Sequence, residues 1–180
     1  MLISLSGKPI HDPEIAQSPW LKFGSEKVWE KLFEHITLYS NKTSGSEIHP
    51  VTQENVIING KTFELGMVDF APSSMKFTLE KKYNTFKACF GVAKKTEHDN
   101  ANCRKEKEGI KFQVLGDGIP FKLNGKNWLT KTFDIDPSCI LVGVSNVSML
   151  ELRSQYQAHY HSCGAPIWAD AAVFLKGMCD

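Results

Sequence analysis

The chain has 180 residues, of which 42% are hydrophobic and 23% are charged, a composition typical of one globular domain with a single buried core. Its 21 Lys and Arg residues nearly balance its 20 Asp and Glu residues, so the formal net charge of +1 disfavours a general nucleic-acid binder. It contains no run of about 18 uncharged apolar residues, so we expect no segment that spans a membrane.

The N-terminal part of the chain divides into an irregular lead-in and a short predicted helix. Three prolines interrupt residues 1–24, and residues 25–180 are expected to form the single folded domain. Ser25 precedes apolar residues at spacings of three and four, which predicts a helix over residues 26–34. An extended segment, His35–Ser40, is expected to follow it.

After residue 50 the apolar period changes to two, which predicts short β-strands. Asn59-Gly60 separates two of these segments and predicts a two-residue hairpin turn, because both residues tolerate positive φ. Residues 94–108 have no apolar period and mix both charge signs, which predicts a solvated loop. Many short strands with few helices predict an all-β fold, a β-sandwich. The predicted strands are Asn55–Ile58, Thr62–Leu65, Met75–Leu79, Phe86–Val92, Ile110–Leu115, Leu129–Ile135, Ile140–Val147, a strand ending near Leu152, and Ala171–Leu175.

Four motifs occur in a characteristic order between about residues 55 and 175. They are Gly66-Met67-Val68-Asp69-Phe70-Ala71-Pro72-Ser73, Tyr83-Asn84-Thr85-Phe86-Lys87-Ala88-Cys89-Phe90-Gly91, Phe112-Gln113-Val114-Leu115-Gly116-Asp117-Gly118 and Trp168-Ala169-Asp170-Ala171. This pattern resembles the NPCBM domain, a carbohydrate-binding module attached to certain bacterial glycoside hydrolases and found in other extracellular proteins. The resemblance implies a jelly-roll-like β-sandwich of the galactose-binding-domain type and a carbohydrate ligand, with galactose-containing glycans as the first expectation. One position departs from the family pattern, because Phe70 stands where the family commonly has His before Ala-Pro-Ser.

Three residues within these motifs have both a structural and a functional interpretation. Asp117, between two glycines, either caps the amides of a turn or binds a metal ion. Trp168 at the start of the last strand either closes the core or stacks on a sugar ring. Asp170 is a possible ligand for Ca²⁺, which prefers carboxylate and carbonyl oxygens.

The segment after the strand ending near Leu152 is rich in aromatic and hydrogen-bonding side chains. Sugars present hydroxyl edges and C–H faces, so such a mixture on a loop is typical of a glycan site. The alternative is a polar loop that only covers a sheet edge. A zinc site on His159, His161 and Cys163 is a weaker alternative, because no fourth ligand is evident. The predicted glycan-binding residues are Tyr156, Gln157, His159, Tyr160, His161 and Trp168.

The motifs of common enzyme classes are absent from the sequence, so we expect a non-catalytic binding protein. Neither a Gly-x-Ser-x-Gly elbow, nor a His-Glu-x-x-His pair, nor a phosphate-binding glycine loop occurs. The expected partner is a glycan or glycoprotein. The alternative is an extracellular protein-interaction or adhesion module that has kept the sandwich and lost sugar binding, an alternative that the departure at Phe70 favours.

Cysteines and glycosylation sequons indicate the compartment. Exposed free thiols are unusual, so Cys103 in the charged loop favours secretion, one or two disulfides and a leftover cysteine. Sequons at Asn41 and Asn146 would be used only in a secretory pathway. We therefore expect an extracellular or secretory location. The five cysteines are Cys89, Cys103, Cys139, Cys163 and Cys179.

Overall fold

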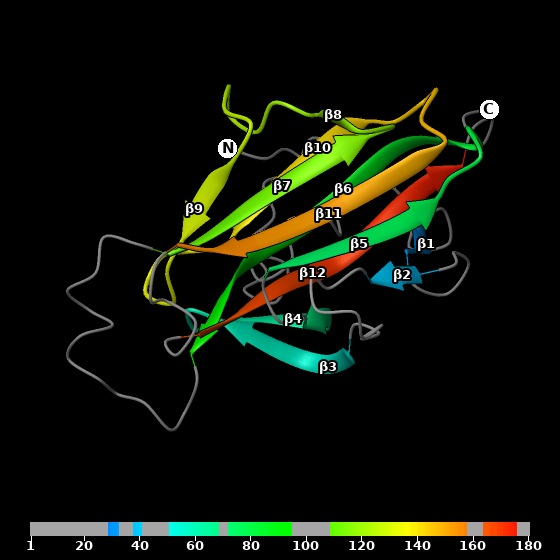
Figure 1. Cartoon of the computed structure of the whole chain (residues 1–180). Coiled ribbons are helices and arrows are strands. Elements are labelled where there is room, and N and C mark those ends of the chain that lie inside the picture. The colour runs from blue at the N-terminus through cyan, green and yellow to red at the C-terminus, as the bar shows by residue number, and fades with distance from the viewer. Residues whose placement is uncertain are drawn as a thin grey trace, which may run out of the picture.

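The computed structural model of the protein describes residues 29–32, 38–40, 51–68, 72–94, 109–157 and 164–175. These residues form two antiparallel sheets packed face to face, which confirms the predicted all-β sandwich (Figure 1). The first sheet has the order β10-β6-β12-β4-β3, with β1 also paired to β12. Its strands are β1 (Trp29–Lys31), β3 (Val51–Ile58), β4 (Lys61–Val68), β6 (Tyr83–Lys94), β10 (Ser138–Gly143) and β12 (Gly164–Leu175).

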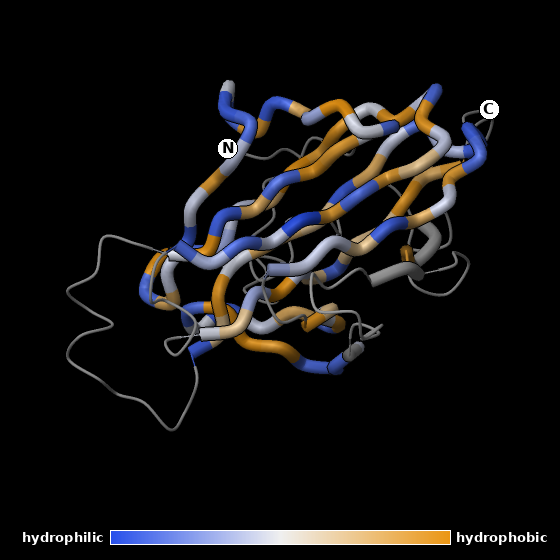
Figure 2. The backbone as a smooth tube through the Cα atoms, in the orientation of Figure 1, coloured by the Kyte–Doolittle hydropathy of each residue, from blue (hydrophilic) through white to orange (hydrophobic). Residues whose placement is uncertain are grey.

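The second sheet has the order β2-β5-β11-β7-β8, with β9 also paired to β7. Its central strands alternate between buried apolar and more polar residues, the period-two pattern that a half-buried strand requires (Figure 2). Its strands are β2 (Leu38–Ser40), β5 (Ser73–Thr78), β7 (Ile110–Gly116), β8 (Ile119–Pro120), β9 (Leu129–Lys131) and β11 (Met149–Tyr156).

The main core lies between the two sheets and is built around three aromatic rings. Phe90 of β6 and Trp168 of β12 come from the first sheet, and Phe112 of β7 comes from the second. The ring centroids lie 4.9 Å apart for Phe90 and Phe112, 5.1 Å for Phe90 and Trp168, and 5.4 Å for Phe112 and Trp168. Tilted and edge-on contacts at such separations are the favourable geometries for aromatic pairs.

A second, smaller apolar cluster lies on the opposite face of the first sheet, under the β3–β4 hairpin. The turn of that hairpin is Asn59-Gly60, with φ of 45° and 77°, as the sequence predicted. Ile58 approaches Gly91 of β6 so closely that a Cβ built at Gly91 would lie 2.5 Å from its Cγ2 atom. A side chain at position 91 would therefore push Ile58 away from β6.

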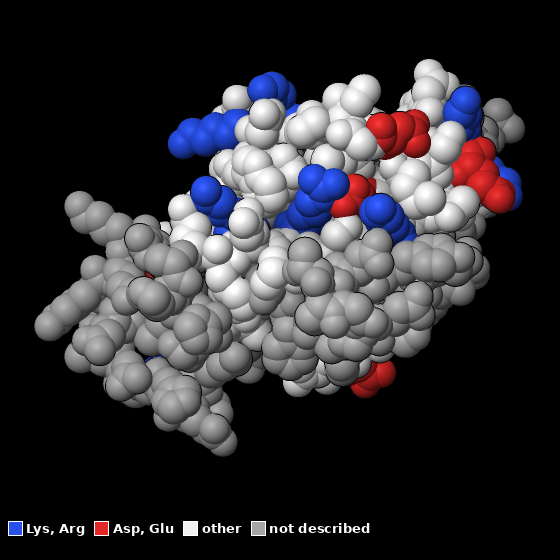
Figure 3. Space-filling model, viewed as in Figure 1, with Lys and Arg blue, Asp and Glu red and all other residues white. Residues whose placement is uncertain are grey.

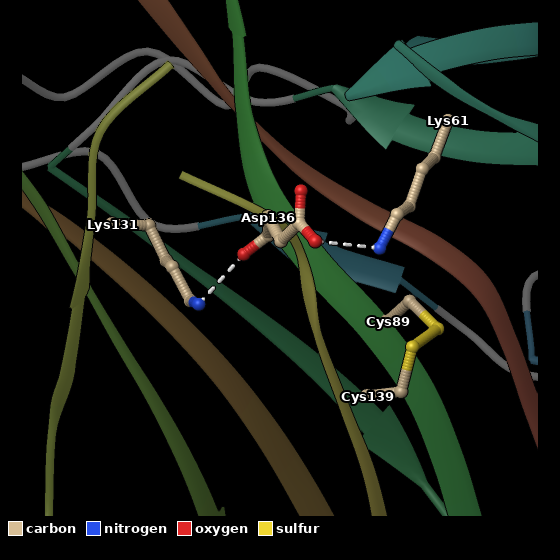
Figure 4. The surroundings of a disulfide bond; sticks show 5 residues. All are labelled: Lys61, Cys89, Lys131, Asp136 and Cys139. Carbon is tan, nitrogen blue, oxygen red and sulfur yellow. Dashed lines mark hydrogen bonds and ion pairs between the residues drawn. A yellow bond between two sulfur atoms is a disulfide. The ribbon is translucent and has the colours of Figure 1, made fainter. Parts of the chain in front are cut away.

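Polar contacts hold the tip of the same hairpin. The Asp136 carboxylate accepts hydrogen bonds from the Asn59 side-chain amide at 2.9 Å and from the Lys61 ammonium at 2.8 Å. Lys131 donates to the Asp136 carbonyl oxygen at 2.7 Å (Figure 4). The loop before β10 is thus tied to the hairpin, next to a disulfide bond between Cys89 and Cys139, which face each other across β6 and β10.

The N-terminal helix predicted over residues 26–34 is wrong where the structure describes that segment. Trp29–Lys31 form strand β1, with Trp29 opposite Phe174 of β12, and the Leu32 amide donates to the Ala171 carbonyl at 3.0 Å. The helical spacing is overridden because this part of β12 has no partner from β4, and β1 supplies the missing hydrogen bonds. Residues 26–28 and 33–34 lie outside the described residues.

Other strand predictions are confirmed with changed bounds. The segment expected over Leu129–Ile135 ends at Lys131, because the Ile135 amide closes a turn onto the Thr132 carbonyl. The strand expected over Ile140–Val147 ends at Gly143, because Val147 closes a similar turn onto Val144. The predicted loop over residues 94–108 lies outside the described residues, apart from Lys94 at the end of β6.

We expect Phe86→Ala to lower the free energy of unfolding by about 3–5 kcal/mol, because it opens a cavity at a fully buried position of β6. Chemical denaturation followed by fluorescence measures this change. Leu141→Ala, a similar truncation at an exposed residue of β10, is the control and should cost less than about 1 kcal/mol. Equal losses for the two variants would contradict the placement of the core.

We also expect the disulfide to raise the free energy of unfolding by up to about 4 kcal/mol, because it closes a long loop in the unfolded chain. Its two cysteines are separated by 50 residues. The double variant Cys89→Ala, Cys139→Ala should unfold at lower denaturant than the oxidised protein and match the reduced protein. Alkylation of the native, unreduced chain should label at most three of the five cysteines, since the disulfide occupies two. Five labelled cysteines would contradict the disulfide.

Candidate functional site

The predicted glycan-binding segment begins at the end of β11. Tyr156 is half-buried and packs against the main core, and Gln157 follows it at the sheet edge. The Gln157 amide donates to the Gly109 carbonyl at 2.9 Å, and the Gly109 amide donates to the Gln157 side-chain oxygen at 3.4 Å. These bonds tie the residue after β11 to the residue before β7. The other predicted residues of this segment, His159, Tyr160 and His161, lie outside the described residues, as does Cys163.

Trp168 occupies a different place from the loop. Its side chain is 1% exposed and packs against Phe90 and Phe112. A ring buried to this extent has no free face for a sugar, so the structure favours the interpretation in which Trp168 closes the core. Trp168 is therefore a core residue in this structure.

Asp117 braces the turn after β7. Its carboxylate accepts the Met149 amide at 2.8 Å and the Ser148 amide at 3.1 Å, with both carboxylate oxygens in contact with the latter. The side chain thus positions the beginning of β11, which is the structural interpretation of the Gly-Asp-Gly motif. A metal ion at the Asp117 carboxylate stays a prediction of the sequence. Among the described residues, no three His, Cys, Asp or Glu side chains gather closely enough to hold a metal ion.

Asp170 lies at a β-bulge in the middle of β12. The pairing of β12 with β6 shifts by one residue between Ala169 and Ala172, and Asp170 has a φ of 47°. Its carboxylate accepts the backbone amide of Leu65 at 3.1 Å. Along β12, the pairing with β4 ends at Ala169 and the pairing with β1 begins at Ala172. The Asp170 side chain therefore links β12 to β4 at the point where β1 replaces β4 as the neighbouring strand.

The environment of Asp170 disfavours its charge. Burial raises the pKa of this carboxyl, the hydrogen bond from Leu65 opposes that effect, and the neighbouring negative charge of Glu64 adds to it. The nearby positive charge of Lys87 lowers the pKa only in part. Asp170 therefore has a structural role in this geometry, and a calcium ion at this carboxylate remains a prediction of the sequence.

The outward face of the second sheet carries a polar cluster that the sequence analysis did not identify as a site. Glu151 of β11 is 6% exposed and accepts hydrogen bonds from Ser74 of β5 and from Arg153 two residues along its own strand. Burial opposes the ionisation of Glu151, but these hydrogen bonds and the charges of Arg153 and Lys76 outweigh it and lower the pKa of its carboxyl. The alternation within β11 could have indicated this face, since Glu151 and Arg153 alternate with Leu150 and Leu152.

The described residues form no helix, and accordingly none of their segments provides a helix that could cross a membrane.

Comparisons with known proteins agree on the architecture. The sequence model of the family described as "NPCBM/NEW2 domain" matches residues 29–174. No curated protein is similar enough in sequence to count as a match.

Several solved structures share the fold. The CBM51-2 and INT domains of ZmpB from Clostridium perfringens align with 19% identity and a TM-score of 0.56, covering 78% of this chain and 30% of that one. The same two domains, with CBM51-2 in complex with GlcNAc, align with 19% identity and a TM-score of 0.54 over 76% of this chain and 29% of that one. Tandem CBM51 modules of Sp3GH98 from Streptococcus pneumoniae align with 20% identity and a TM-score of 0.50, covering 83% of this chain and 44% of that one. The chain thus spans less than a third of the length of the first two.

The raised pKa of Asp170 predicts a pH-dependent stability. The folded state holds this proton more tightly than the unfolded state, so the stability associated with Asp170 is greatest below the unfolded pKa and is lost as pH rises through the higher folded pKa. Asp170→Asn keeps an acceptor for the Leu65 amide and removes the charge. Relative to the wild type, this variant should therefore gain stability as pH rises from about 4 to about 7.

Asp170→Ala is the contrasting variant, because it leaves the Leu65 amide without its acceptor. This variant should lower the free energy of unfolding by about 1–3 kcal/mol across the same pH range. Urea denaturation at several pH values measures both variants. Parallel stability–pH curves for Asp170→Asn and the wild type would contradict the raised pKa.

Proposed function

The chain belongs to the NPCBM/NEW2 domain family, and on that premise we propose that it is a carbohydrate-binding module without catalytic activity of its own. The observation that carries this proposal is the extent of the family match, which runs from the first residue of β1 to within β12 and so includes both sheets. The ligand class comes from the family, and the fold shared with the CBM51 module bound to GlcNAc is consistent with it.

A surface site follows from the packing. The interior between the sheets is filled by large side chains, including the three rings of Phe90, Phe112 and Trp168, so a sugar must bind outside it. We place the site on the loop that begins at Tyr156 and Gln157 and includes His159, Tyr160 and His161. The bonds between Gln157 and Gly109 hold one end of this loop on the rigid sheet, an arrangement typical of binding loops.

The proposed location is outside the cell. The Cys89–Cys139 disulfide is stable in an oxidising compartment, and Asn146, the residue that would carry a glycan in the second sequon, is exposed at the turn before β11. Within the class of saccharides, galactose-containing glycans are the first ligands to test, with GlcNAc-containing glycans beside them.

A glycan array probed with the whole chain tests the function. We expect reproducible binding of a subset of glycans at millimolar to micromolar affinity, or about −4 to −8 kcal/mol, as a shallow site for one sugar would give. Tyr160→Ala and the double variant Tyr156→Ala, Tyr160→Ala should abolish binding, because each removes a ring that can stack on a sugar. The thermal melt of each variant shows whether the domain is still folded.

Tyr156→Phe is the matched control, because it keeps the ring that packs against the core and removes only the hydroxyl. It should stay folded and keep most of the binding. Undiminished binding by a folded double variant would place the site elsewhere, and the half-buried Trp128 would be the next residue to test. Silence across the array, together with a specific protein partner, would instead favour the interaction-module alternative.

A further inference from the structure

The outward face of the second sheet has an ordered arrangement of charged residues around Arg153. Strand register places Arg153 of β11 directly between Ser74 of β5 and Gln113 of β7. The same register makes Lys76 of β5 and Lys111 of β7 the diagonal neighbours of Arg153 on its two sides. Diagonal pairs in an antiparallel sheet lie about 7–8 Å apart, within reach of one ligand group for side chains as long as lysine.

The guanidinium of Arg153 is held in one orientation. Its Nε donates to Glu151 Oε1 at 2.5 Å and its Nη2 donates to Glu151 Oε2 at 3.1 Å. Ser74 donates a further hydrogen bond to the same carboxylate, which fixes Glu151 in turn. These two bonds use two of the five N–H donors of an arginine and leave three for another partner.

The anion that holds Arg153 is hidden from solvent, whereas the cations are not. The side chain of Glu151 is 7% exposed and that of Arg153 is 41% exposed. Lys76 and Lys111 are also partly exposed, so the cluster presents three cations outward against one buried carboxylate. Basic side chains accordingly gather over β5, β7 and β11, around one acidic group (Figure 3).

The cluster also contains an acceptor without a partner. Gln113 is 4% exposed, and its Oε1 atom has no hydrogen-bond partner among the described residues. A buried acceptor without a partner is unfavourable, and a water molecule or a hydroxyl of a ligand would satisfy it.

We propose that this face is a second saccharide site, which takes an acidic sugar through its carboxylate. A preorganised guanidinium matches a carboxylate with two parallel hydrogen bonds, and the lysines on both diagonals add charge attraction. The hydroxyls of the sugar ring suit the polar groups of Ser74 and Gln113. The inference rests on the proposed function in taking the ligand to be a saccharide, and it goes beyond that function in assigning a separate face and a charged ligand.

Titration of the whole chain with an oligosaccharide containing a hexuronate, followed by calorimetry, tests the proposal. The matched probe is the methyl ester of the same oligosaccharide, which keeps every hydroxyl and loses the charge. We expect the acid to bind at least about tenfold more tightly than the ester, and its affinity to fall as salt rises. Equal binding of the two, or binding of neither, would overturn the proposal.

Variants locate the site. The double variant Lys76→Gln, Lys111→Gln should weaken binding of the acid about tenfold, and Arg153→Lys should weaken it further while keeping the charge that pairs with Glu151. Lys126→Gln removes an exposed cation from the turn after β8 and should change nothing. Wild-type affinity in the folded double variant would overturn the proposal, and so would a sulfated oligosaccharide that binds more tightly than the uronate.

The two sites can fail independently. The Tyr160→Ala variant should lose neutral glycans and keep the acid, whereas the Lys76→Gln, Lys111→Gln variant should keep neutral glycans and bind the acid about tenfold more weakly. If the protein binds neutral glycans but not the acid, only the proposal of the second site is contradicted. Loss of neutral binding throughout, with the acid still bound, would remove the loop site and leave this face in place.

Discussion

Contact between the two sheets through Phe90, Phe112 and Trp168 is the interaction on which the rest of the structure depends. These rings come from β6, β7 and β12, so their packing joins the sheets at the centre of the core. Packing in this contact buries the Trp168 indole nitrogen, which has no hydrogen-bond partner in the part of the chain that the structure describes. The apolar surface removed from water by three large rings offsets that cost.

Strand β12 extends this constraint to the first sheet. It pairs with β6 along nearly its whole length, while its other side is shared between β4 and β1. The bulge at Asp170 lies where these two neighbours meet, and the Asp170 carboxylate accepts a β4 amide there. The Asp170 carboxylate, which the sequence suggested as a ligand for Ca²⁺, thus takes part in the hydrogen bonding of the sheet.

A filled interior leaves the surface as the place for binding, and the sandwich offers two kinds of surface. Segments at the ends of strands can vary without disturbing the strand pairing, and the proposed neutral-glycan site begins at such an end, at Tyr156 of β11. The outward face of β5, β11 and β7 is rigid instead, so its charged groups keep fixed spacings. Glu151 is an example, because Ser74 of β5 and Arg153 of its own strand β11 both donate hydrogen bonds to its carboxylate.

The sequence by itself determined the elements whose signals are local. The Asn59-Gly60 turn, the alternation of β5 and the family motifs were sufficient for the hairpin, the all-β class and the family, because each depends on neighbouring residues. Only the tertiary structure decided what depends on distant partners. Residues 29–31 pair with β12 instead of forming a helix, Trp168 enters the core, and Glu151, Arg153 and Lys111 meet on one face. Strand pairing joins residues far apart in the chain, and the periodicity of one segment carries no information about its neighbour in space.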